Sequence, residues 1–361
     1  MDEQTTRSAG EPALTRAPRT DATLLYQSRD GLYAADMLIA AVNGLDFFTW
    51  LDTHPGSVWD IAGHFAFHRR PVDVMTTLFA AMGLVERTPD CVRTTALARE
   101  HLVAGSPWFL GPYYPKLSDR PIARDLIEVL RSGRPARFAG RQNEADWHRA
   151  METETFAEEF TAAMDCRGLV TAQALAANLD LSRHERLLDV AGGSGVFACA
   201  MAARFDRLRA AVFEKPPVDR IAARSIEKRG LADRVEVIAG DMLEQPLPQG
   251  YDVHLFSNVL HDWGEDTVRQ LLHASAAAIP AGGLLVVHES FLNAGKTGPL
   301  AVAEYSVLLM HVCEGRCYSL SEMETWLADA GFSLRTTIPT AVGRSALVAV
   351  RSADARTGLP A

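Results

Sequence analysis

The sequence predicts an α/β protein with a Rossmann-like, doubly wound sheet in its C-terminal half and an α-helical, winged-helix-like domain at its N-terminal side. Three observations carry this prediction. Strand and helix patterns alternate from residue 183 onward, as in sheets whose parallel strands are joined by helices. A glycine-rich turn follows the first of these strands, and three helical segments with a hairpin precede residue 104. The length of 361 residues suits two domains.

Composition and charge narrow the class of protein. The chain is 48% apolar and 22% charged, with a formal net charge of -9, which is typical of a globular protein and excludes a disordered or fibrous one. This acidic balance gives no general attraction to nucleic acid or to an anionic membrane, so we expect neither as a partner. The five cysteines are scattered and odd in number, which favours a reducing cytoplasm over a disulfide framework.

The two ends of the chain differ from the rest. Residues 1–20 contain acids and prolines but no apolar stretch of the kind found in a signal peptide, so we expect a flexible leader. A second flexible segment is expected over 353–361. The longest apolar runs, such as 284–287, fall far short of the ~18 residues that a membrane-spanning helix needs.

Residues 21–104 are expected to form the N-terminal domain. Apolar residues recur at helical spacing, and Pro55, Gly56 and Ser57 interrupt them. The predicted elements are, in order, helices over 34–51, 58–62 and 71–85 and a short hairpin over 85–95. Three helices followed by a hairpin are the element order of a winged helix.

This domain is better interpreted as a dimerisation module than as a reader of DNA. Its third helix carries Asp73 and mostly apolar residues, and only Arg69 and Arg70 precede it. Two arginines are too few for the phosphate contacts that DNA affinity requires. The first helix has more apolar residues than one core face requires, so we expect part of it to bury against a second chain in a homodimer. The residues concerned are Met37, Leu38, Val42, Phe47, Phe48 and Trp50.

Residues 105–182 are expected to be a helical linker that also contributes to a ligand pocket. The stretch is rich in aromatic residues and arginine, and two interpretations stay open: pocket lining, or ordinary helix packing with solvated arginines. These residues are Trp108, Tyr113, Tyr114, Arg134, Arg137, Phe138, Arg141, Trp147 and His148. Either one of these arginines or Arg167 would suit a bidentate clamp on a carboxylate.

Residues 183–352 carry the strand–helix alternation. Strands are expected over 186–190, 210–214, 235–238, 252–256, 283–289 and 345–350, and helices over 196–205, 219–230, 267–278 and 321–331. Alternation of this kind predicts a parallel sheet. Ligands of such sheets bind outside the carboxyl ends of the strands.

Three successive strand ends carry residues suited to an adenosine-containing ligand. The first strand ends at Asp189 and runs into Ala191-Gly192-Gly193-Ser194-Gly195, where glycine lets the backbone approach a ligand. The spacing lacks the last glycine of the dinucleotide motif G-x-G-x-x-G. Glu214 ends the next strand and can accept from both ribose hydroxyls, and Asp241 with Met242 follows the third. Each of these residues also has a purely structural explanation. Glu214 could be a carboxylate at the start of a helix, Asp241 a turn residue and Met242 a residue of the hydrophobic core.

Together these motifs resemble the class I S-adenosylmethionine-dependent methyltransferases. The similarity lies in LLDVAGGSGVFACAMA, FEKPPV, GDMLEQPLP, DVHLFSNVLHDWGEDTVRQLL and GGLLVVHES. More narrowly, the chain resembles the small-molecule O-methyltransferases of plant phenolic metabolism and of bacterial antibiotic pathways, from about residue 30 to 350. The resemblance implies S-adenosylmethionine as cofactor, a small phenolic acceptor and a homodimer.

The resemblance also implies roles for individual residues. It places Asp189 and Gly193 against the methionine moiety, Glu214 on the ribose, Asp241 and Met242 at the adenine, and Ser257 near the amino-acid end of the cofactor. Phe160 and Met164 match the interdomain helix that closes over the methyl group, and Trp147, Met310 and Cys313 are expected in the substrate pocket.

His261 matches the general base of this family, and Glu289 matches the carboxylate that orients it. A phenol with a pKa near ~10 is a poor nucleophile at neutral pH, whereas an imidazole near ~6.5 can take its proton. Plant members carry a second Glu where this chain has Cys317. Catalysis by positioning alone therefore stays open, as does methylation of a ring carbon ortho to a hydroxyl, for instance in a hydroxylated aromatic amino acid.

Two further alternatives are less favoured. His311, Cys313 and Cys317 have soft ligand atoms at close spacing, but only three are local, so we expect no metal site. A non-enzymatic regulator that binds a ligand in the sheet domain and DNA through the hairpin is the more distant alternative. The acidic balance of the chain argues against it.

Overall fold

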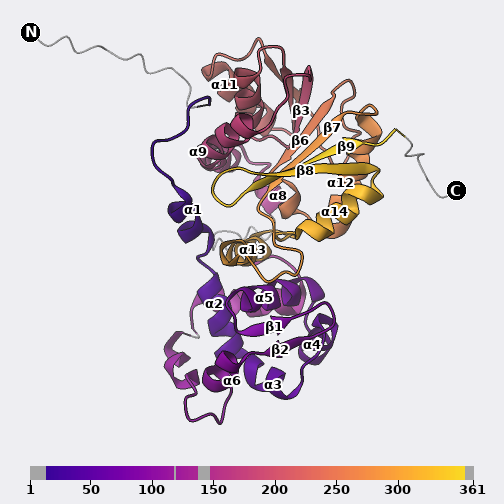
Figure 1. Cartoon of the computed structure of the whole chain (residues 1–361). Helices are drawn as coiled ribbons and strands as arrows, with labels where there is room; N and C mark the ends of the chain where they lie inside the picture. Colours follow the sequence, from indigo (N-terminus) through magenta and orange to yellow (C-terminus); the bar gives the residue numbers. More distant parts are fainter. Residues whose placement is uncertain (1–13, 118, 137–146, 354–361) are drawn as a thin grey trace, which may run out of the picture.

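The computed structural model describes residues 14–117, 119–136 and 147–353. A lobe built on a seven-stranded sheet lies beside a helical lobe with a small hairpin, and the helix α13 (Leu300–Val312) lies between them (Figure 1). The helix α1 (Thr23–Asp30) also contacts α13. The region between the lobes is therefore built from α1 and α13, which are far apart in the sequence.

The sheet has the strand order β5-β4-β3-β6-β7-β9-β8. Its strands are β3 (Arg186–Val190), β4 (Arg209–Glu214), β5 (Val235–Ala239), β6 (Val253–Ser257), β7 (Leu284–Glu289), β8 (Phe332–Pro339) and β9 (Ser345–Arg351). The first five run parallel, so the carboxyl ends of β3, β4, β5, β6 and β7 meet at one edge. This arrangement confirms the strands expected between residues 186 and 289.

Two features of the sheet differ from the sequence prediction. The closing strand β9 pairs antiparallel to β7, so the sheet is not parallel throughout. The strand β8, which was not predicted, pairs antiparallel to β9 at the edge of the sheet. A short loop at 340–344 replaces the helical crossover that a parallel connection would need. Most residues of β8 are partly or fully exposed, so its sequence lacks the apolar run of a buried strand.

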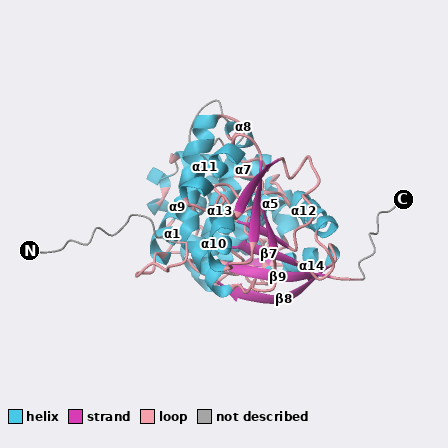
Figure 2. Ribbon diagram, turned by 90° about the horizontal axis from the view of Figure 1, so that it is seen from above, coloured by secondary structure: helices cyan, strands magenta, loops and turns pink. Residues whose placement is uncertain are grey.

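Helices cover both faces of the sheet (Figure 2). On one face, α9 (Glu154–Asn178), α10 (Val196–Arg204) and α11 (Val218–Lys228) pack with Leu187 of β3. On the other, α12 (Glu265–Ala278) and α14 (Leu320–Asp329) pack with the next residue, Leu188. Neighbouring residues of a strand point to opposite faces, which explains why β3 is buried along almost its whole length.

In the helical lobe, several helices precede a short hairpin, as predicted, but the first predicted helix is divided. The elements of this lobe are α2 (Ala34–Ile39), a π-helical turn (Ala40–Gly44), α3 (Phe47–Thr53), α4 (Val58–Phe65), α5 (Arg69–Ala81), β1 (Val85–Arg87), β2 (Val92–Thr94), α6 (Ala96–Leu102) and α7 (Pro121–Ser132). The expected continuous helix over 34–51 is wrong. Asp46 adopts a left-handed conformation, with φ of 48°, and separates α3 from the π-helical turn.

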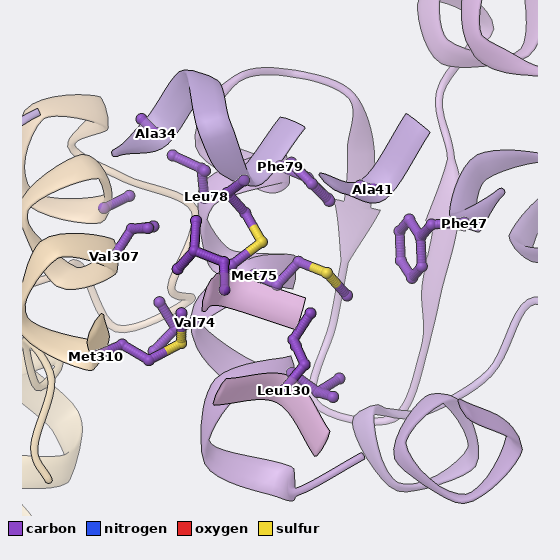
Figure 3. Close-up of a cluster of buried hydrophobic side chains, with 14 of the residues drawn as sticks. Ala34, Ala41, Phe47, Val74, Met75, Leu78, Phe79, Leu130, Val307 and Met310 are labelled. Atoms are coloured by element: carbon purple, nitrogen blue, oxygen red, sulfur yellow. The ribbon is translucent and has the colours of Figure 1, made fainter. Parts of the chain in front are cut away.

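The apolar residues of the first helical stripe are buried inside their own chain. Met37, Phe47 and Phe48 have no exposed surface and belong to a core that includes Leu126 of α7 and Leu308 of α13. Met37, Phe47 and Phe48 are therefore core residues of their own chain, whereas Leu38 and Trp50 are only partly buried. Figure 3 shows Val307 and Met310 of α13 against Val74, Met75 and Leu78 of α5, so part of this core closes the contact between the lobes.

A buried group of charges also joins the lobes. Asp73 of α5 pairs with Arg87, with Lys296 at 3.1 Å and with Arg316 at 3.5 Å. Glu322 of α14 pairs with Lys296 and, at 2.6 Å, with Arg316. These five residues are called the interlobe charge cluster below. Asp73 of α5 thus has a structural role.

The remaining short elements are η2 (Gly111–Tyr113), η3 (Pro115–Leu117), α8 (Trp147–Ala150) and η5 (Leu260–Asp262). Within the described ranges, no single helix has the length and hydropathy of a membrane span. A pair bent by 67°, Thr23–Gly44 with Phe47–Thr53, passes that test only when its two parts are taken together, on length and composition alone.

Candidate active site

The glycine-rich turn after β3 presents backbone to the carboxyl edge of the sheet. Gly193 has a φ of 57°, and a Cβ added there would meet no atom within 4 Å. Its N–H donates to Glu214 Oε2 at 3.0 Å, and Glu214 Oε1 accepts from the N–H of Lys215 at 2.9 Å. Gly195 is enclosed instead, since a Cβ there would lie 3.1 Å from Val212. The turn is therefore tightly packed at Gly195, whereas the backbone at Gly193 has open space beside it.

Asp189 supports this turn from beneath. The carboxylate is buried and accepts the N–H of Ala198, in the first turn of α10, at 3.1 Å. A Cβ on Gly192 would lie 2.6 Å from Asp189 Cγ, so the loop closes tightly over the carboxylate. Burial, with the nearby charge of Glu214, raises the pKa of Asp189 to about 7. Its expected contact with the methionine moiety stays a prediction.

The structure brings the next two strand ends to the same place. Burial raises the pKa of Glu214 to about 7, and the charge of Asp241 adds to this effect. The N–H of Gly240 donates to the backbone oxygen of Glu214 at 3.0 Å, and Asp241 Oδ1 accepts the N–H of Leu243 at 2.8 Å. Met242 is half-buried against the core below α12. A carboxylate whose charge is poorly solvated is well placed to accept from ligand hydroxyls.

The helix α9 borders the same turn. Asp165 Oδ1 accepts from Ser194 of the turn and from Arg229 of the segment after α11, each at 2.5 Å. Phe160 stacks with Phe156 against the start of α11, and Met164 lies one helical turn farther along. Both residues thus belong to a helix that is bonded to the turn through Asp165, and their expected place over the methyl group stays a prediction.

Ser257 ends β6 and belongs to a chain of hydrogen bonds. Asn258 Nδ2 donates to Ser257 Oγ at 3.3 Å, Ser257 Oγ lies 2.9 Å from His288 Nδ1, and His288 Nε2 lies 2.9 Å from Thr340 Oγ1. Because Thr340 Oγ1 donates its proton to the carbonyl of Arg344, His288 donates through Nε2 and accepts at Nδ1. Burial and Arg344 lower the pKa of His288 to about 3, so its ring is neutral.

His261 and Glu289 form a buried pair at the ends of β6 and β7. His261 Nδ1 makes a short hydrogen bond to Glu289 Oε2. The other carboxylate oxygen of Glu289, Oε1, accepts the N–H groups of Val259 and Leu260 at 2.8 and 3.0 Å. Burial alone would lower the pKa of His261, but the carboxylates of Glu289 and Asp262 outweigh it and raise that pKa. In the neutral ring, the hydrogen bond to Glu289 favours the proton on Nδ1, which leaves the lone pair of Nε2 to act as a base.

Tyr305 and Asp262, neither of which the sequence indicated as a site residue, lie near Nε2. Tyr305 Oη of α13 lies 3.3 Å from His261 Nε2 and accepts from Arg167 Nη2 at 2.9 Å. Asp262 Oδ1 lies 3.6 Å from the same nitrogen. Asp30 of α1 pairs with Arg167 at 3.5 Å. Tyr305 and Asp30 reach the site through the packing of α13 and α1, for which the local sequence carries no signal.

Cys317 leaves the pair without a second Glu, as the sequence showed. The Cys317 side chain is fully buried, and burial raises its thiol pKa, so it is neutral. The nearby loop is held by backbone instead: the N–H of Gly315 donates to the carbonyl of Asp262 at 3.1 Å. A Cβ on Gly315 would lie 2.0 Å from the carbonyl oxygen of His261, so only glycine fits there.

The expected pocket residues have different outcomes. Met310 is fully buried in the core between α5 and α13, and its assignment to a pocket wall stays a prediction. Cys313 lies behind the site, with Sγ donating to the backbone oxygen of Leu309 at 3.0 Å and 3.7 Å from that of His261. The Trp147 side chain lies outside the described residues.

The positions of the side chains do not support the two less favoured hypotheses, a metal site and a DNA-binding regulator. Over the described ranges, no group of three or more His, Cys, Asp or Glu side chains is placed to hold a metal ion. His311 Nε2 lies 3.5 Å from Asp125. Arg70 is turned inward and donates to the carbonyls of Gly315 and Gly133 at 2.8 and 3.0 Å, so it does not face a phosphate.

The residues at the open turn fit an adenosine-containing methyl donor. The exposed backbone at Gly193 gives room for its amino-acid end, and the carboxylate of Glu214 can accept from a ribose. Asp241 and Met242 offer a hydrogen-bond acceptor and an apolar surface at the adjacent strand end. S-adenosylmethionine supplies an electrophilic methyl group on a sulfonium. The chain supplies residues suited to hold this donor, together with the buried pair of His261 and Glu289.

Comparisons with known proteins agree with this site. A model of the O-methyltransferase domain matches residues 124–333. The chain is 30% identical to 3-hydroxy-5-methyl-1-naphthoate 3-O-methyltransferase of Streptomyces sahachiroi, over 95% of this chain and 99% of that protein. It is 32% identical to the L-tyrosine C(3)-methyltransferase of Streptomyces lavendulae, over 59% of each protein.

A solved structure is similar over almost the whole chain. The O-methyltransferase family 2 protein from Planctomyces limnophilus, solved as a complex with apigenin, superposes with a TM-score of 0.85 and 32% identity. The match covers 95% of this chain and 99% of that one. The donor bound by this family is S-adenosylmethionine. The chain therefore belongs to the O-methyltransferase family and is an S-adenosylmethionine-dependent methyltransferase.

Proposed function

We propose that the enzyme methylates the hydroxyl of a small phenolic acceptor in secondary metabolism, with His261 as the general base. The observation that carries this proposal is the buried pair of His261 and Glu289, in which Nδ1 is bonded to the carboxylate and Nε2 is left available as a base. Positioning of donor and acceptor supplies much of the rate, and the base removes the phenolic proton as the C–O bond forms. The naphthoate and flavone named for two similar proteins support an aromatic acceptor.

A screen with radiolabelled S-adenosylmethionine tests this proposal. Phenolic acids, hydroxylated aromatic amino acids and polyketide aglycones serve as acceptors, and NMR of the product identifies the methylated atom. We expect an O-methyl resonance from at least one phenol. Donor binding without transfer to any phenol of the panel contradicts the proposal.

C-methylation of a ring carbon ortho to a hydroxyl is the second candidate. The similarity to a tyrosine C(3)-methyltransferase favours it, and Cys317 in place of a second Glu is compatible with it. Deprotonation of the phenol by His261 would then activate the ortho carbon. An aryl-methyl resonance in the same NMR experiment identifies this outcome.

We also propose that the enzyme is a cytoplasmic homodimer whose winged-helix-like N-terminal domain, over 21–104, serves dimerisation. The support is a set of exposed large apolar side chains in and near α1, within this domain, and over residues 108–117, directly after it. These are Leu24, Leu25, Leu32, Trp108, Leu110, Tyr113 and Leu117. Burial in a second copy would remove them from water. Residues 105–182 would complete the substrate pocket, and 183–352 would bind the donor.

A further inference from the structure

Two arginines share one tyrosine ring beside the proposed base. The guanidinium carbon of Arg167 lies 5.2 Å from the centre of the Tyr305 ring, and that of Arg344 lies 5.8 Å from it. Arg167 comes from α9, whereas Arg344 comes from the loop between β8 and β9. Tyr305 Oη itself lies 3.3 Å from His261 Nε2. Both cations therefore lie next to the place where an acceptor must present its hydroxyl.

These two cations lack a full set of anionic partners. Among the described residues, Asp30 is the one carboxylate within 4 Å of either guanidinium, at 3.5 Å from Arg167 and 3.9 Å from Arg344. Glu289 is already committed to His261 and to two backbone N–H groups. A buried cation without a close anion is costly, and a second cation nearby increases that cost. An added negative charge would balance the group.

Donor atoms of both side chains also stay unused. Arg344 Nη2 and Arg167 Nε are buried and make no hydrogen bond within the described part of the chain. Arg344 is only 3% exposed, and its orientation is fixed because Nε donates to Asn258 Oδ1 at 2.8 Å. The spare donor of Arg344 is thus held in place rather than free to turn toward solvent.

A small cavity adjoins these residues. Its volume is about 20 Å³, and its walls include Tyr26, Asp30, Val302, Tyr305 and Arg344. A space of this size holds about one water molecule, so an aromatic acceptor requires the surrounding side chains to move. The walls combine apolar surface with the guanidinium of Arg344 and the carboxylate of Asp30, and Asp30 also lies 3.5 Å from Arg167. One carboxylate is thus shared between two guanidinium groups, which leaves net positive charge for an anionic substituent on the ring.

We propose that Arg344, assisted by Arg167, binds the carboxylate of an aromatic hydroxy-acid acceptor and so directs its hydroxyl toward His261 Nε2. The two oxygens of a carboxylate match the N–H donors of a guanidinium. This inference rests on the proposed methylation of a phenolic acceptor. The carboxylate of the methyl donor is the other source of the same chemistry, because Asn258 joins Arg344 to Ser257.

Calorimetry in the presence of S-adenosylhomocysteine tests the proposal without turnover. The probes are pairs of hydroxynaphthoates and hydroxybenzoates with their carboxamides, which keep the ring and the hydroxyl but remove the charge. We expect wild-type enzyme to bind at least one acid tenfold or more tightly than its amide. Arg344→Met should bring that acid to the affinity of the amide, and Arg344→Lys should restore part of the difference.

Two controls separate a specific loss from a general one. Arg234→Met removes a part-buried arginine that donates to three backbone carbonyls away from the site, and it should keep the preference for the acid. The affinity of Arg344→Met for S-adenosylhomocysteine should stay within twofold of wild type. A large loss of that affinity, with the acid preference intact, would assign Arg344 to the donor and overturn the proposal.

If Arg344→Met does not fold, the acid and amide affinities of the wild-type enzyme still test the proposal. Equal affinity for every acid and its amide overturns it. Turnover with the same pairs separates this inference from the proposed function. Methylation of neutral phenols without any preference for acids contradicts only the inference, whereas binding of acids without transfer to any phenol contradicts only the proposed function.

Discussion

At the residue scale, the protonation of His261 decides which nitrogen can act as a base. Glu289 uses one oxygen for the two backbone N–H groups of Val259 and Leu260, so the carboxylate cannot turn away from His261. Its second oxygen then fixes the proton of the imidazole on Nδ1. The other nitrogen, Nε2, lies 3.3 Å from Tyr305 Oη.

Replacement of Glu289 should move the pH dependence of the reaction. The carboxylate raises the pKa of His261 above its ordinary value of 6.5, so the wild-type kcat/KM should rise with pH through a pKa above that value. Glu289→Gln removes the negative charge and should shift this rise to lower pH, with kcat reduced by ~10–100-fold because the ring is less well oriented. A pH profile of kcat/KM for both proteins measures the shift. An unmoved profile would show that the pair does not control the reaction.

Glu214 provides the prediction for donor binding. Glu214→Ala removes the acceptor for the ribose hydroxyls, which should weaken binding of S-adenosylmethionine by ~1–3 kcal/mol. Calorimetry with S-adenosylhomocysteine measures the change. Glu244→Ala, an exposed carboxylate near the same loop, is the control and should bind normally. Unchanged affinity in Glu214→Ala would contradict the ribose assignment.

The residues that the sequence identified share one physical reason. Asp189, Glu214, Asp241 and Glu289 end or follow strands, and the carboxyl ends of parallel strands meet at one edge of the sheet. Strand periodicity is a local property, so this part of the site could be predicted. Tyr305 and Arg344 lie 44 and 83 residues from His261 in the chain, and only packing brings them to it.

At the element scale, the connection between α5 and α14 depends on charge as well as on apolar packing. Asp73 neutralises part of Arg87, Lys296 and Arg316, and these four side chains are mostly buried. Asp73→Asn leaves three cations with only Glu322 as a partner, which should lower the free energy of unfolding by ~3–5 kcal/mol. Urea unfolding measures the loss.

The control for Asp73→Asn is an exposed ion pair of the same lobe. Glu86→Gln breaks the pair with Arg93, where both side chains are more than half exposed, and should cost under ~1 kcal/mol. Equal losses for the two variants would contradict the role of the interlobe charge cluster. The cluster also predicts weakness in acid. Although burial opposes it, Arg316 lowers the pKa of Glu322 to about 2, and Arg316, Lys296 and Arg87 likewise lower that of Asp73. Their stabilisation is complete above the unfolded pKa values near 4 and is lost as pH falls below them.

Errors in the predicted elements arose where tertiary context overrides the local pattern. The apolar residues over 34–51 have helical spacing, but the backbone turns at Asp46. The helices α2 and α3 then pack separately into the same hydrophobic core. The strand β8 is polar because it forms the sheet edge.

At the scale of the whole molecule, assembly is the prediction that the structure has changed most. The buried residues Met37, Phe47 and Phe48 no longer argue for a second chain, whereas exposed leucines of α1 do. Light scattering at micromolar concentration should give a mass near twice 39.4 kDa. Leu24→Glu with Leu25→Glu should favour the monomer, and Leu243→Glu, an exposed leucine of the sheet lobe, should not. A wild-type monomer would contradict the proposed dimer.

The central claim is that His261 removes the acceptor proton, and the kinetics of His261→Ala test it most directly. The variant should lose ~10²–10⁴-fold in kcat while its affinity for S-adenosylhomocysteine stays near that of wild type. Raising the pH should restore part of the rate, because the phenol then ionises without a base. A near-native rate at pH 7, or a loss under tenfold with a profile set by the acceptor's own pKa, would contradict the claim and leave positioning as the source of the rate.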